Sequence, residues 1–156
     1  MTRMDPALAR RCFAAARVAR LGTVDDLGCP HLVPIVFATD GADHVVTAVD
    51  RKPKSTARLR RLHNIEVTPA VCLLADGYAE DWSTLWWVRA DGGARIVPPD
   101  APDLATREEY EAALVRLRAK YPQYRDDPPA GPVIVVAVHD WTGWQADPAS
   151  APHPAG

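Results

Sequence analysis

The chain has 156 residues, the size of one ordinary domain, and 47% of them are hydrophobic. Its 18 basic and 20 acidic residues leave a formal charge of −2. This composition is that of a folded globular protein and excludes disorder along the whole chain. The nearly balanced charge argues against a nucleic-acid-binding protein, and the longest apolar runs are too short to span a membrane. We therefore expect a cytoplasmic protein that binds neither nucleic acid nor membrane.

The sequence carries none of the common catalytic or metal-binding motifs. Its three cysteines fit neither a disulfide framework nor a C-x-x-C pair, and its five histidines form no H-E-x-x-H or H-x-H pair. The glycine-rich Rossmann and P-loop motifs and the G-x-S-x-G elbow of hydrolases are also missing. We expect no metal site, and a reaction would need the reactivity of a bound cofactor.

The first part of the chain predicts a helix followed by a β-hairpin. Residues 5–18 begin with an Asp-Pro pair that suits a helix start and continue with an alanine-rich, apolar-periodic pattern. Residues 19–24 and 31–39 have the composition of two strands joined by a turn. Pro30 and Pro34 remove hydrogen-bond donors from the second strand, which is therefore expected to be an edge strand, to be bulged, or to turn its backbone toward something other than a strand.

The remaining elements are mostly strands, with helices in the middle and late parts of the chain. The expected elements up to residue 75 are a strand at 43–49, a short helix at 57–65 capped by Ser55 or Thr56, and a strand at 70–75. A hairpin of 86–90 and 94–97, with its turn at Asp91-Gly92-Gly93, is expected next. It is followed by a helix that begins with a capping box of Thr106 and Glu109 and runs to Lys120, and by a strand from Pro132 to His139 that continues through Trp144. Such strands at hairpin spacing, without β-α-β alternation, favour an antiparallel barrel with peripheral helices. Residues 146–156 are rich in Pro and Ala and are expected to be a disordered tail.

The strongest local signal is a run of positive charge. Six basic residues and no acidic one lie between residues 51 and 61, namely Arg51, Lys52, Lys54, Arg58, Arg60 and Arg61. They straddle the expected junction of a strand with a helix N-terminus, where free N–H groups and positive charge together bind phosphate. The alternative is a solvated basic surface, and the spacing alone does not decide between the two.

Several segments resemble one family. The segments are Leu21-Gly22-Thr23-Val24, Gly28-Cys29-Pro30-His31-Leu32-Val33-Pro34, the basic run, and Leu62-x-Asn64-Ile65-x-x-x-Pro69. Together they resemble the pyridoxamine-phosphate-oxidase-like split β-barrel superfamily, over about residues 10 to 145. Lys52-Pro53-Lys54, Asp81-Trp82-Ser83 and Leu85-Trp86-Trp87-Val88-Arg89 are similar to its actinobacterial branch of B-type enzymes that use the deazaflavin coenzyme F420. The substrate-binding motifs of the vitamin B6 oxidases themselves are missing.

The resemblance implies a fold, an assembly and a site. The expected fold is mainly β (α+β), a six-stranded antiparallel split β-barrel of the FMN-binding type with peripheral helices, in residues 1–145. The expected assembly is a homodimer with cofactor sites at the interface, in which a hydride passes between the deazaflavin and a small organic substrate. The implied phosphate and tail contacts are Lys52, Lys54, Ser55, Arg58 and Arg61. The implied ring and backbone contacts are His31, Val33, Pro34, Val36, Thr47, Ala48, Val49 and Asp50, with Asp81 and Trp82 as candidates from the second subunit.

Two further choices remain open from the sequence. Six clustered bases exceed what the single phosphate of FMN needs, so we favour coenzyme F420, with its phosphodiester and glutamate tail, over FMN. The catalytic residues are not identified, and Tyr78, His31 or water could supply a proton. An FMN-binding oxidoreductase, or a split-barrel protein that binds flavin or deazaflavin without catalysis, for storage or sensing, is the alternative function.

Overall fold

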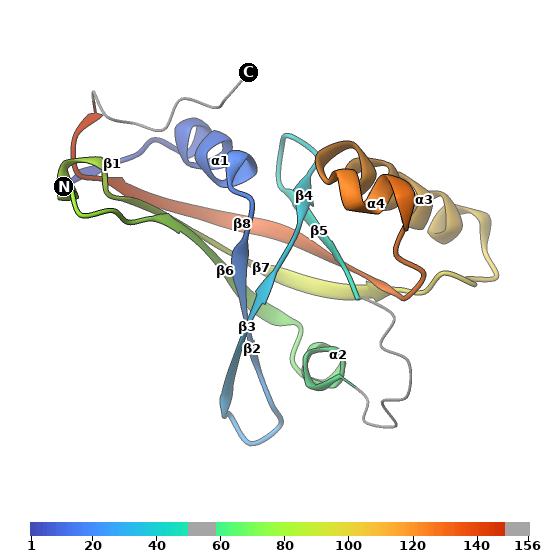
Figure 1. Cartoon of the computed structure of the whole chain (residues 1–156). Coiled ribbons are helices and arrows are strands. Elements are labelled where there is room, and N and C mark those ends of the chain that lie inside the picture. Colours follow the sequence, from blue (N-terminus) through green and yellow to red (C-terminus); the bar gives the residue numbers. More distant parts are fainter. Residues whose placement is uncertain (50–58, 149–156) are drawn as a thin grey trace.

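The computed structural model describes residues 1–49 and 59–148. These residues form an antiparallel sheet in the order β3-β2-β6-β7-β8-β5-β4, with β1 paired to β8 (Figure 1). The strands are β1 (Thr2–Arg3), β2 (Ala19–Val24), β3 (Pro30–Ile35), β4 (Ala38–Thr39), β5 (His44–Ala48), β6 (Ala70–Gly77), β7 (Trp86–Val97) and β8 (Val133–Gln145). The helices are α1 (Pro6–Ala15), α2 (Arg60–Val67), α3 (Leu104–Lys120) and α4 (Pro122–Asp126), with a 3-10 turn η1 (Trp82–Thr84). The expected mainly β (α+β) split-barrel fold is confirmed. The described residues form eight strands where six were expected, and two of the eight, β1 and β4, have only two residues each.

The sheet is curled so that its two ends approach each other. β3 and β4 lie at opposite ends of the strand order, yet only residues 36–37 separate them in the chain. We call residues 36–37 the strand crossing, because there the chain passes from one end of the sheet to the other. The predicted single strand over 31–39 is therefore wrong, since its two halves pair with different strands, β2 and β5.

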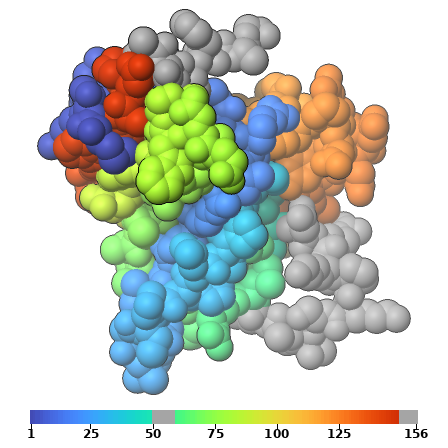
Figure 2. Space-filling model, turned by 60° about the vertical axis from the view of Figure 1, so that its left-hand side comes forward, coloured from blue at the N-terminus to red at the C-terminus, as the bar shows by residue number. Residues whose placement is uncertain are grey.

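The start of the chain agrees with the sequence. Asp5 caps α1 by accepting a hydrogen bond from the Leu8 N–H at 2.8 Å, and Pro6 occupies the first helical turn. β2 has the predicted bounds. β3 pairs with β2 and ends the strand order, so the edge strand that the prolines predict is confirmed. Figure 2 shows the β2–β3 hairpin projecting from the lower end of the molecule.

The predicted hairpin over 86–97 is wrong. These residues form the single strand β7, which pairs with β6 on one side and β8 on the other. The Asp91-Gly92-Gly93 segment makes a register irregularity in this strand instead of a turn. Gly92 is required there because a Cβ atom would lie 2.3 Å from the Ala137 carbonyl oxygen of β8. Close contact between backbones, and not a reversal of the chain, explains this glycine.

The late helix begins earlier than expected. Asp103 is its N-cap and accepts hydrogen bonds from the Thr106 N–H and hydroxyl, so the predicted capping box of Thr106 and Glu109 is wrong. Asp103 suits this position because a short carboxylate reaches the free N–H groups of the first turn. Glu109 instead forms an ion pair with Arg95 of β7. The predicted cap of the middle helix, Ser55-Thr56, lies outside the described residues.

Two hydrophobic cores flank the strands. One fills the inside of the curled sheet beneath α1 and contains Phe13, Leu21, Phe37 and Leu73. The other lies between the sheet and α3, which covers β4 and β5 (Figure 1). β5 separates the two cores, which is why all its residues after His44 are buried. None of the described helices is long and apolar enough to cross a membrane.

Candidate functional site

A pocket lies at the strand crossing. It has a volume of about 260 Å³. It is lined by the residue before β2 and by residues from the end of β3, the crossing, the end of β5, α2 and α4, namely Val18, Pro34, Ile35, Val36, Thr47, Ala48, Arg61 and Tyr124. We call it the crossing pocket. Its walls are both apolar and polar, and Arg61 is the charged side chain among these lining residues.

Hydrogen bonds fix the two strands that form the pocket. The buried hydroxyl of Thr47 donates to the Val36 carbonyl oxygen at 2.7 Å, which ties the crossing to β5. On β3, Pro30 and Pro34 have no N–H, and residues two apart point their backbone groups to the same side of a strand. The β3 edge that faces away from β2 therefore offers the carbonyl groups of residues 30, 32 and 34 and a single N–H, from Leu32. Such an edge suits a ligand that donates hydrogen bonds better than it suits another strand.

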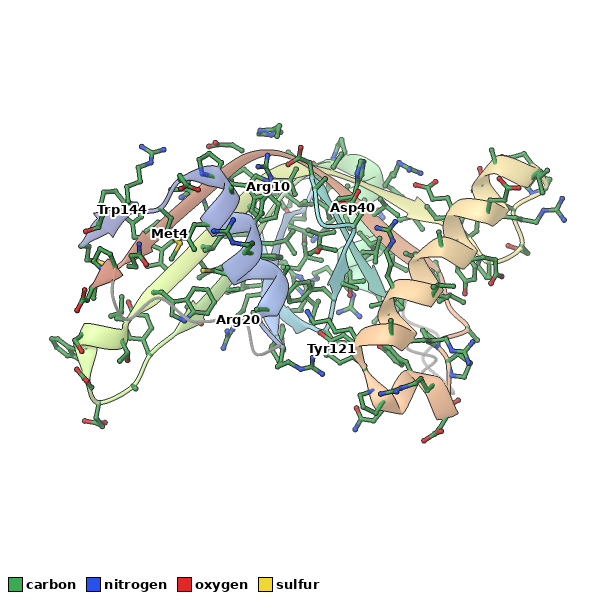
Figure 3. The ribbon with its side chains drawn as sticks, turned by 90° about the horizontal axis from the view of Figure 1, so that it is seen from above. Met4, Arg10, Arg20, Asp40, Tyr121 and Trp144 are labelled. Atoms are coloured by element: carbon green, nitrogen blue, oxygen red, sulfur yellow. The ribbon has the colours of Figure 1, made fainter. Side chains whose placement is uncertain are left out.

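The corner between α3 and α4 closes the pocket from the other side. Tyr121, which lies at this corner in Figure 3, accepts a hydrogen bond from the Phe37 N–H at 3.1 Å through its hydroxyl oxygen. The ring of Tyr124, on the next turn of chain, packs edge-on against the ring of Tyr121 at 5.9 Å. Burial raises the pKa of the Tyr121 hydroxyl, so this group stays protonated at neutral pH. The helical layer is thus anchored to the crossing by a tyrosine.

The structure brings together five of the residues expected at the site. Pro34, Val36, Thr47, Ala48 and Arg61 all line the crossing pocket. Asp50, Lys52, Lys54, Ser55 and Arg58 lie outside the described residues. The chain leaves the described part after Val49 and returns to it at Leu59. Val49 follows the lining residue Ala48 directly, and its N–H donates to the Pro132 carbonyl oxygen.

His31 and Val33 of β3 pair with Thr23 and Leu21 of β2 and do not line the pocket. The Nδ1 atom of His31 is buried and has no hydrogen-bond partner in the described part of the chain. The Oδ1 atom of Asn64, a fully buried residue of α2, has none either, while its Nδ2 donates to the Thr23 hydroxyl at 3.0 Å. One unsatisfied polar atom thus lies on β3 and another on the α2 residue that is hydrogen-bonded to β2.

Asp81 and Trp82 lie far from the crossing pocket in the same chain. Trp86, just beyond η1, pairs with Gln145 at one end of β8, whereas Ala48 pairs with Val133 at the other end. Twelve residue steps along a strand correspond to about 40 Å. The Trp82 side chain is 75% exposed, and Asp81 caps η1 by accepting from the Ser83 N–H. These two residues cannot complete the pocket of their own chain.

Sequence reasoning missed three lining residues, Val18, Ile35 and Tyr124. Tyr124 was missed because α4 was not predicted. The signal was available, since Pro122 directly follows the last turn of α3, and proline is favoured at the first position of a helix. The sequence gives Val18 and Ile35 no feature that distinguishes them from other residues at strand ends, and only the curl of the sheet brings them to the same pocket.

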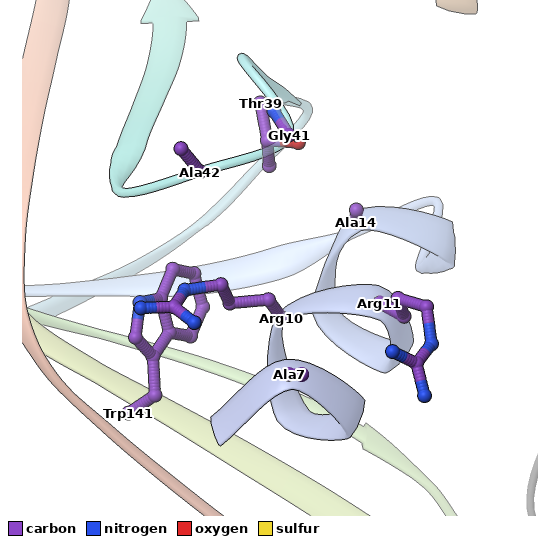
Figure 4. Close-up of a pocket in the computed structure, with 8 residues that line it drawn as sticks. All are labelled: Ala7, Arg10, Arg11, Ala14, Thr39, Gly41, Ala42 and Trp141. Carbon is purple, nitrogen blue, oxygen red and sulfur yellow. Dashed lines mark hydrogen bonds between the residues drawn. The ribbon is translucent and has the colours of Figure 1, made fainter.

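A second pocket, of about 240 Å³, lies between α1 and the turn from β4 to β5 (Figure 4). In Figure 4 the Arg10 side chain extends across Trp141, and the Arg11 side chain points away from it. The Arg10 guanidinium is held by Asp43 at 2.9 Å, and the Trp141 indole N–H donates to the same carboxylate oxygen at 2.9 Å. Two polar side chains of this pocket, those of Arg10 and Trp141, are therefore both held by Asp43.

No group of three His, Cys, Asp or Glu side chains within residues 1–49 and 59–148 is arranged to hold a metal ion. Burial raises the pKa values of the Cys12 and Cys72 thiols, which makes them poor nucleophiles at neutral pH.

The curled sheet, with its strand crossing and helical cover, is a split β-barrel. The sequence matches the profile of the pyridoxamine 5'-phosphate oxidase family over residues 6–145, and the chain belongs to this family. A comparison with curated proteins gives no significant match.

Solved structures with this fold include proteins described as flavin-binding. The chain is similar to a conserved hypothetical protein from Mycobacterium tuberculosis, with 20% identity, 98% of this chain and 92% of that chain covered, and a TM-score of 0.70. It is also similar to a FAD-binding protein from Mesorhizobium loti (16% identity, 91% and 95% covered, TM-score 0.68). A FAD-binding protein from Mycobacterium smegmatis is a further match (17% identity, 92% and 97% covered, TM-score 0.60). At these identities the similarity establishes the fold.

Proposed function

We propose that this protein is an oxidoreductase that uses coenzyme F420, or alternatively FMN, and acts on a small organic substrate. The observation that carries the proposal is the crossing pocket, in which apolar side chains and Arg61 lie close to the two ends of a chain segment rich in lysine and arginine. Membership of the family and the FAD-binding proteins among the similar structures support a flavin-type cofactor. When bound, such a cofactor supplies the hydride chemistry for which the chain has no motif of its own.

The residues present fit such a cofactor. Val36 and Ala48 offer apolar contact to a flat heterocycle, and the carbonyl groups on the free edge of β3 accept hydrogen bonds from ring N–H groups. Arg61 would hold a phosphate together with Lys52 and Lys54. Six bases match a phosphodiester with a glutamate tail better than a single phosphate, which favours coenzyme F420 over FMN.

We further propose that the site is completed in a homodimer. The pocket of about 260 Å³ is smaller than the roughly 300–1,000 Å³ typical of ligand sites. The sheet face that carries Leu32 and Leu74, which are 68% and 37% exposed, offers apolar area to a second copy. Asp81 and Trp82 of that copy could then reach the pocket that they cannot reach in their own chain.

The proposal is tested by titrating the purified protein with coenzyme F420, FMN and FAD and following the change in cofactor fluorescence. We expect binding of coenzyme F420 to be tightest and to weaken as the salt concentration rises. The double variant Lys52→Ala/Lys54→Ala and the single variant Arg61→Ala should each weaken it. The control is Arg107→Ala/Arg116→Ala, which removes two exposed positive charges from α3.

Unchanged affinity in the lysine variant, or equal losses in the lysine and control variants, would place the binding elsewhere. Oxidation of reduced coenzyme F420 in the presence of enones or quinones then tests catalysis. Binding without turnover of any substrate would favour the storage or sensing function.

A further inference from the structure

The Tyr121 hydroxyl joins segments that are far apart in the sequence. It accepts a hydrogen bond from the Phe37 N–H at 3.1 Å, and the Arg17 and Phe37 carbonyl oxygens both lie 2.9 Å from it. One hydroxyl hydrogen is shared between these two acceptors. The residue is only 7% exposed, so water does not replace these contacts readily. A single side-chain oxygen therefore satisfies backbone groups at the strand crossing, where no neighbouring strand does so.

Each contact of Tyr121 adjoins a residue of the crossing pocket. Val18 follows Arg17, and Val36 precedes Phe37. Tyr124, whose ring packs against the Tyr121 ring, lines the pocket as well. Three of the eight described lining residues are thus held in place through Tyr121, which does not itself line the pocket.

We propose that Tyr121 is a positioning residue for the ligand of the crossing pocket. Its hydroxyl sets the distance between Arg17, which lies just before β2, and Phe37 at the crossing, and its ring sets the position of Tyr124. This inference rests on the proposed function, because it assigns the ligand as a planar, flavin-type ring that needs both walls in place. The hydrogen bonds at the crossing would otherwise be made by water, and the pocket would widen.

Lys120 supports this arrangement from the end of α3. Its ammonium donates to the Ala14 and Ala16 carbonyl oxygens, at 3.1 and 2.7 Å, and lies 3.8 Å from the centre of the Phe37 ring. A cation suits this place because the C-terminus of α1 carries the negative end of the helix dipole. The Arg17 guanidinium lies 4.8 Å from the centre of the Tyr121 ring. The crossing is therefore held by the Tyr121 hydroxyl, which bonds the Phe37 backbone, and by the contact of Lys120 with the Phe37 ring.

The chain offers a matched control for Tyr121. Tyr110, within α3, is 5% exposed and donates one hydrogen bond to the Gly131 carbonyl oxygen at 2.9 Å. It does not line the crossing pocket. Tyr121→Phe and Tyr110→Phe thus each remove one buried hydroxyl, but only the first removes it from the crossing.

The experiment measures three quantities in the wild type and both variants: the affinity for coenzyme F420 and for FMN, the stability in urea, and hydrogen exchange over residues 35–38. We expect Tyr121→Phe to lower the affinity at least tenfold and to raise exchange at the crossing at least tenfold. Tyr110→Phe should change both by less than twofold. Lys120→Met, which keeps the hydroxyl but removes the cation beside the Phe37 ring, should fall between the two. If Tyr121→Phe does not fold, this variant tests whether a loosened crossing weakens binding.

Other results would overturn the inference. Equal losses of affinity in the two tyrosine variants would show that a general loss of stability weakens binding. Unchanged affinity or unchanged exchange in Tyr121→Phe would show that the crossing holds without this contact. If only Lys120→Met folds, unchanged affinity or exchange in that variant would show that the contacts around Tyr121 do not position the ligand. If the wild type binds neither cofactor, the proposed function is wrong and so is the assignment of a flavin-type ligand. Hydrogen exchange over residues 35–38 in the variants then still decides whether Tyr121 fixes the crossing.

Discussion

Thr47 and Val36 are joined across the strand crossing by a hydrogen bond of 2.7 Å from the threonine hydroxyl to the valine carbonyl oxygen. Thr47 is 3% exposed and is one of the few polar residues buried in the sheet. The bond connects β5 to the chain where β3 ends, so the pocket keeps its shape through side chains and not through a strand ladder.

Replacing Thr47 by valine should weaken the fold at this point. Valine has nearly the same shape but cannot donate, so a partly buried carbonyl group loses its partner. We expect the free energy of unfolding to fall by about 1 kcal/mol or somewhat more. The control is Thr84→Val, because the Thr84 hydroxyl also donates to a backbone carbonyl, that of Asp81 at 2.9 Å, but in an exposed turn. Urea unfolding should show a loss below about 0.5 kcal/mol there, and equal losses would contradict the prediction.

Lys120 should give the protein a pH dependence in the alkaline range. Burial, with a smaller effect of Arg17, lowers the pKa of Lys120 to about 8 from its ordinary value of 10.5. Between these two values the folded state binds fewer protons than the unfolded state, so this group raises the free energy of unfolding as the pH increases.

Lys120→Met removes this contribution. Urea unfolding of both proteins at pH 7.5, 8.5 and 9.5 cancels the effects of the other titrating groups, which the two share. The stability of the wild type relative to the variant should increase over this range. A difference that is constant with pH, or that decreases, would mean that the Lys120 ammonium is not destabilised in the folded state.

Asp43 should act in the opposite, acidic range. The Trp141 indole N–H and the Arg10 guanidinium donate to its carboxylate and lower its pKa below the ordinary value. The stabilisation is present above about pH 4 and is lost as the pH falls through the lowered pKa of the folded state. Asp43→Asn should therefore make unfolding less sensitive to pH between about 5 and 2, as followed by tryptophan fluorescence. Asp100→Asn, at an exposed residue, should leave the acid profile unchanged, and a change of the same size there would refute the assignment.

Local signals in the sequence predicted much of the fold. The Asp-Pro start of α1, the bounds of β2 and the edge position of β3 all follow from capping, alternation and the missing N–H groups of proline. Each of these features depends on neighbouring residues in the chain. The strand crossing does not, because residues 31–39 form one nearly continuous apolar run that is typical of a single strand, and only their pairing with β2 and β5 divides them.

The candidate site shows the same division. Pro34, Val36 and Thr47 were named because they lie in segments that resemble the family, and the structure places them in one pocket, while their role in binding stays a prediction. Tyr121 was not found, since its role depends on contacts with Arg17 and Phe37, which are more than 80 residues away in the sequence. A tyrosine at the end of a helix carries no local sign of such a contact.

Gly92 and Gly93 show how one sequence pattern can have two structural meanings, and they permit a sharp test. Asp-Gly-Gly predicts a turn, but neither glycine has a positive φ angle, and both lie within β7. A Cβ atom at Gly92 would lie 2.3 Å from the Ala137 carbonyl oxygen, whereas one at Gly93 would meet nothing within 4 Å. Gly92→Ala should therefore push β7 and β8 apart and lower the free energy of unfolding by about 1–3 kcal/mol. Gly93→Ala should cause no loss, since alanine fits there and restricts the unfolded chain. Thermal and urea unfolding of the two variants distinguish the continuous strand from a hairpin, because a glycine turn at these residues would make both substitutions costly.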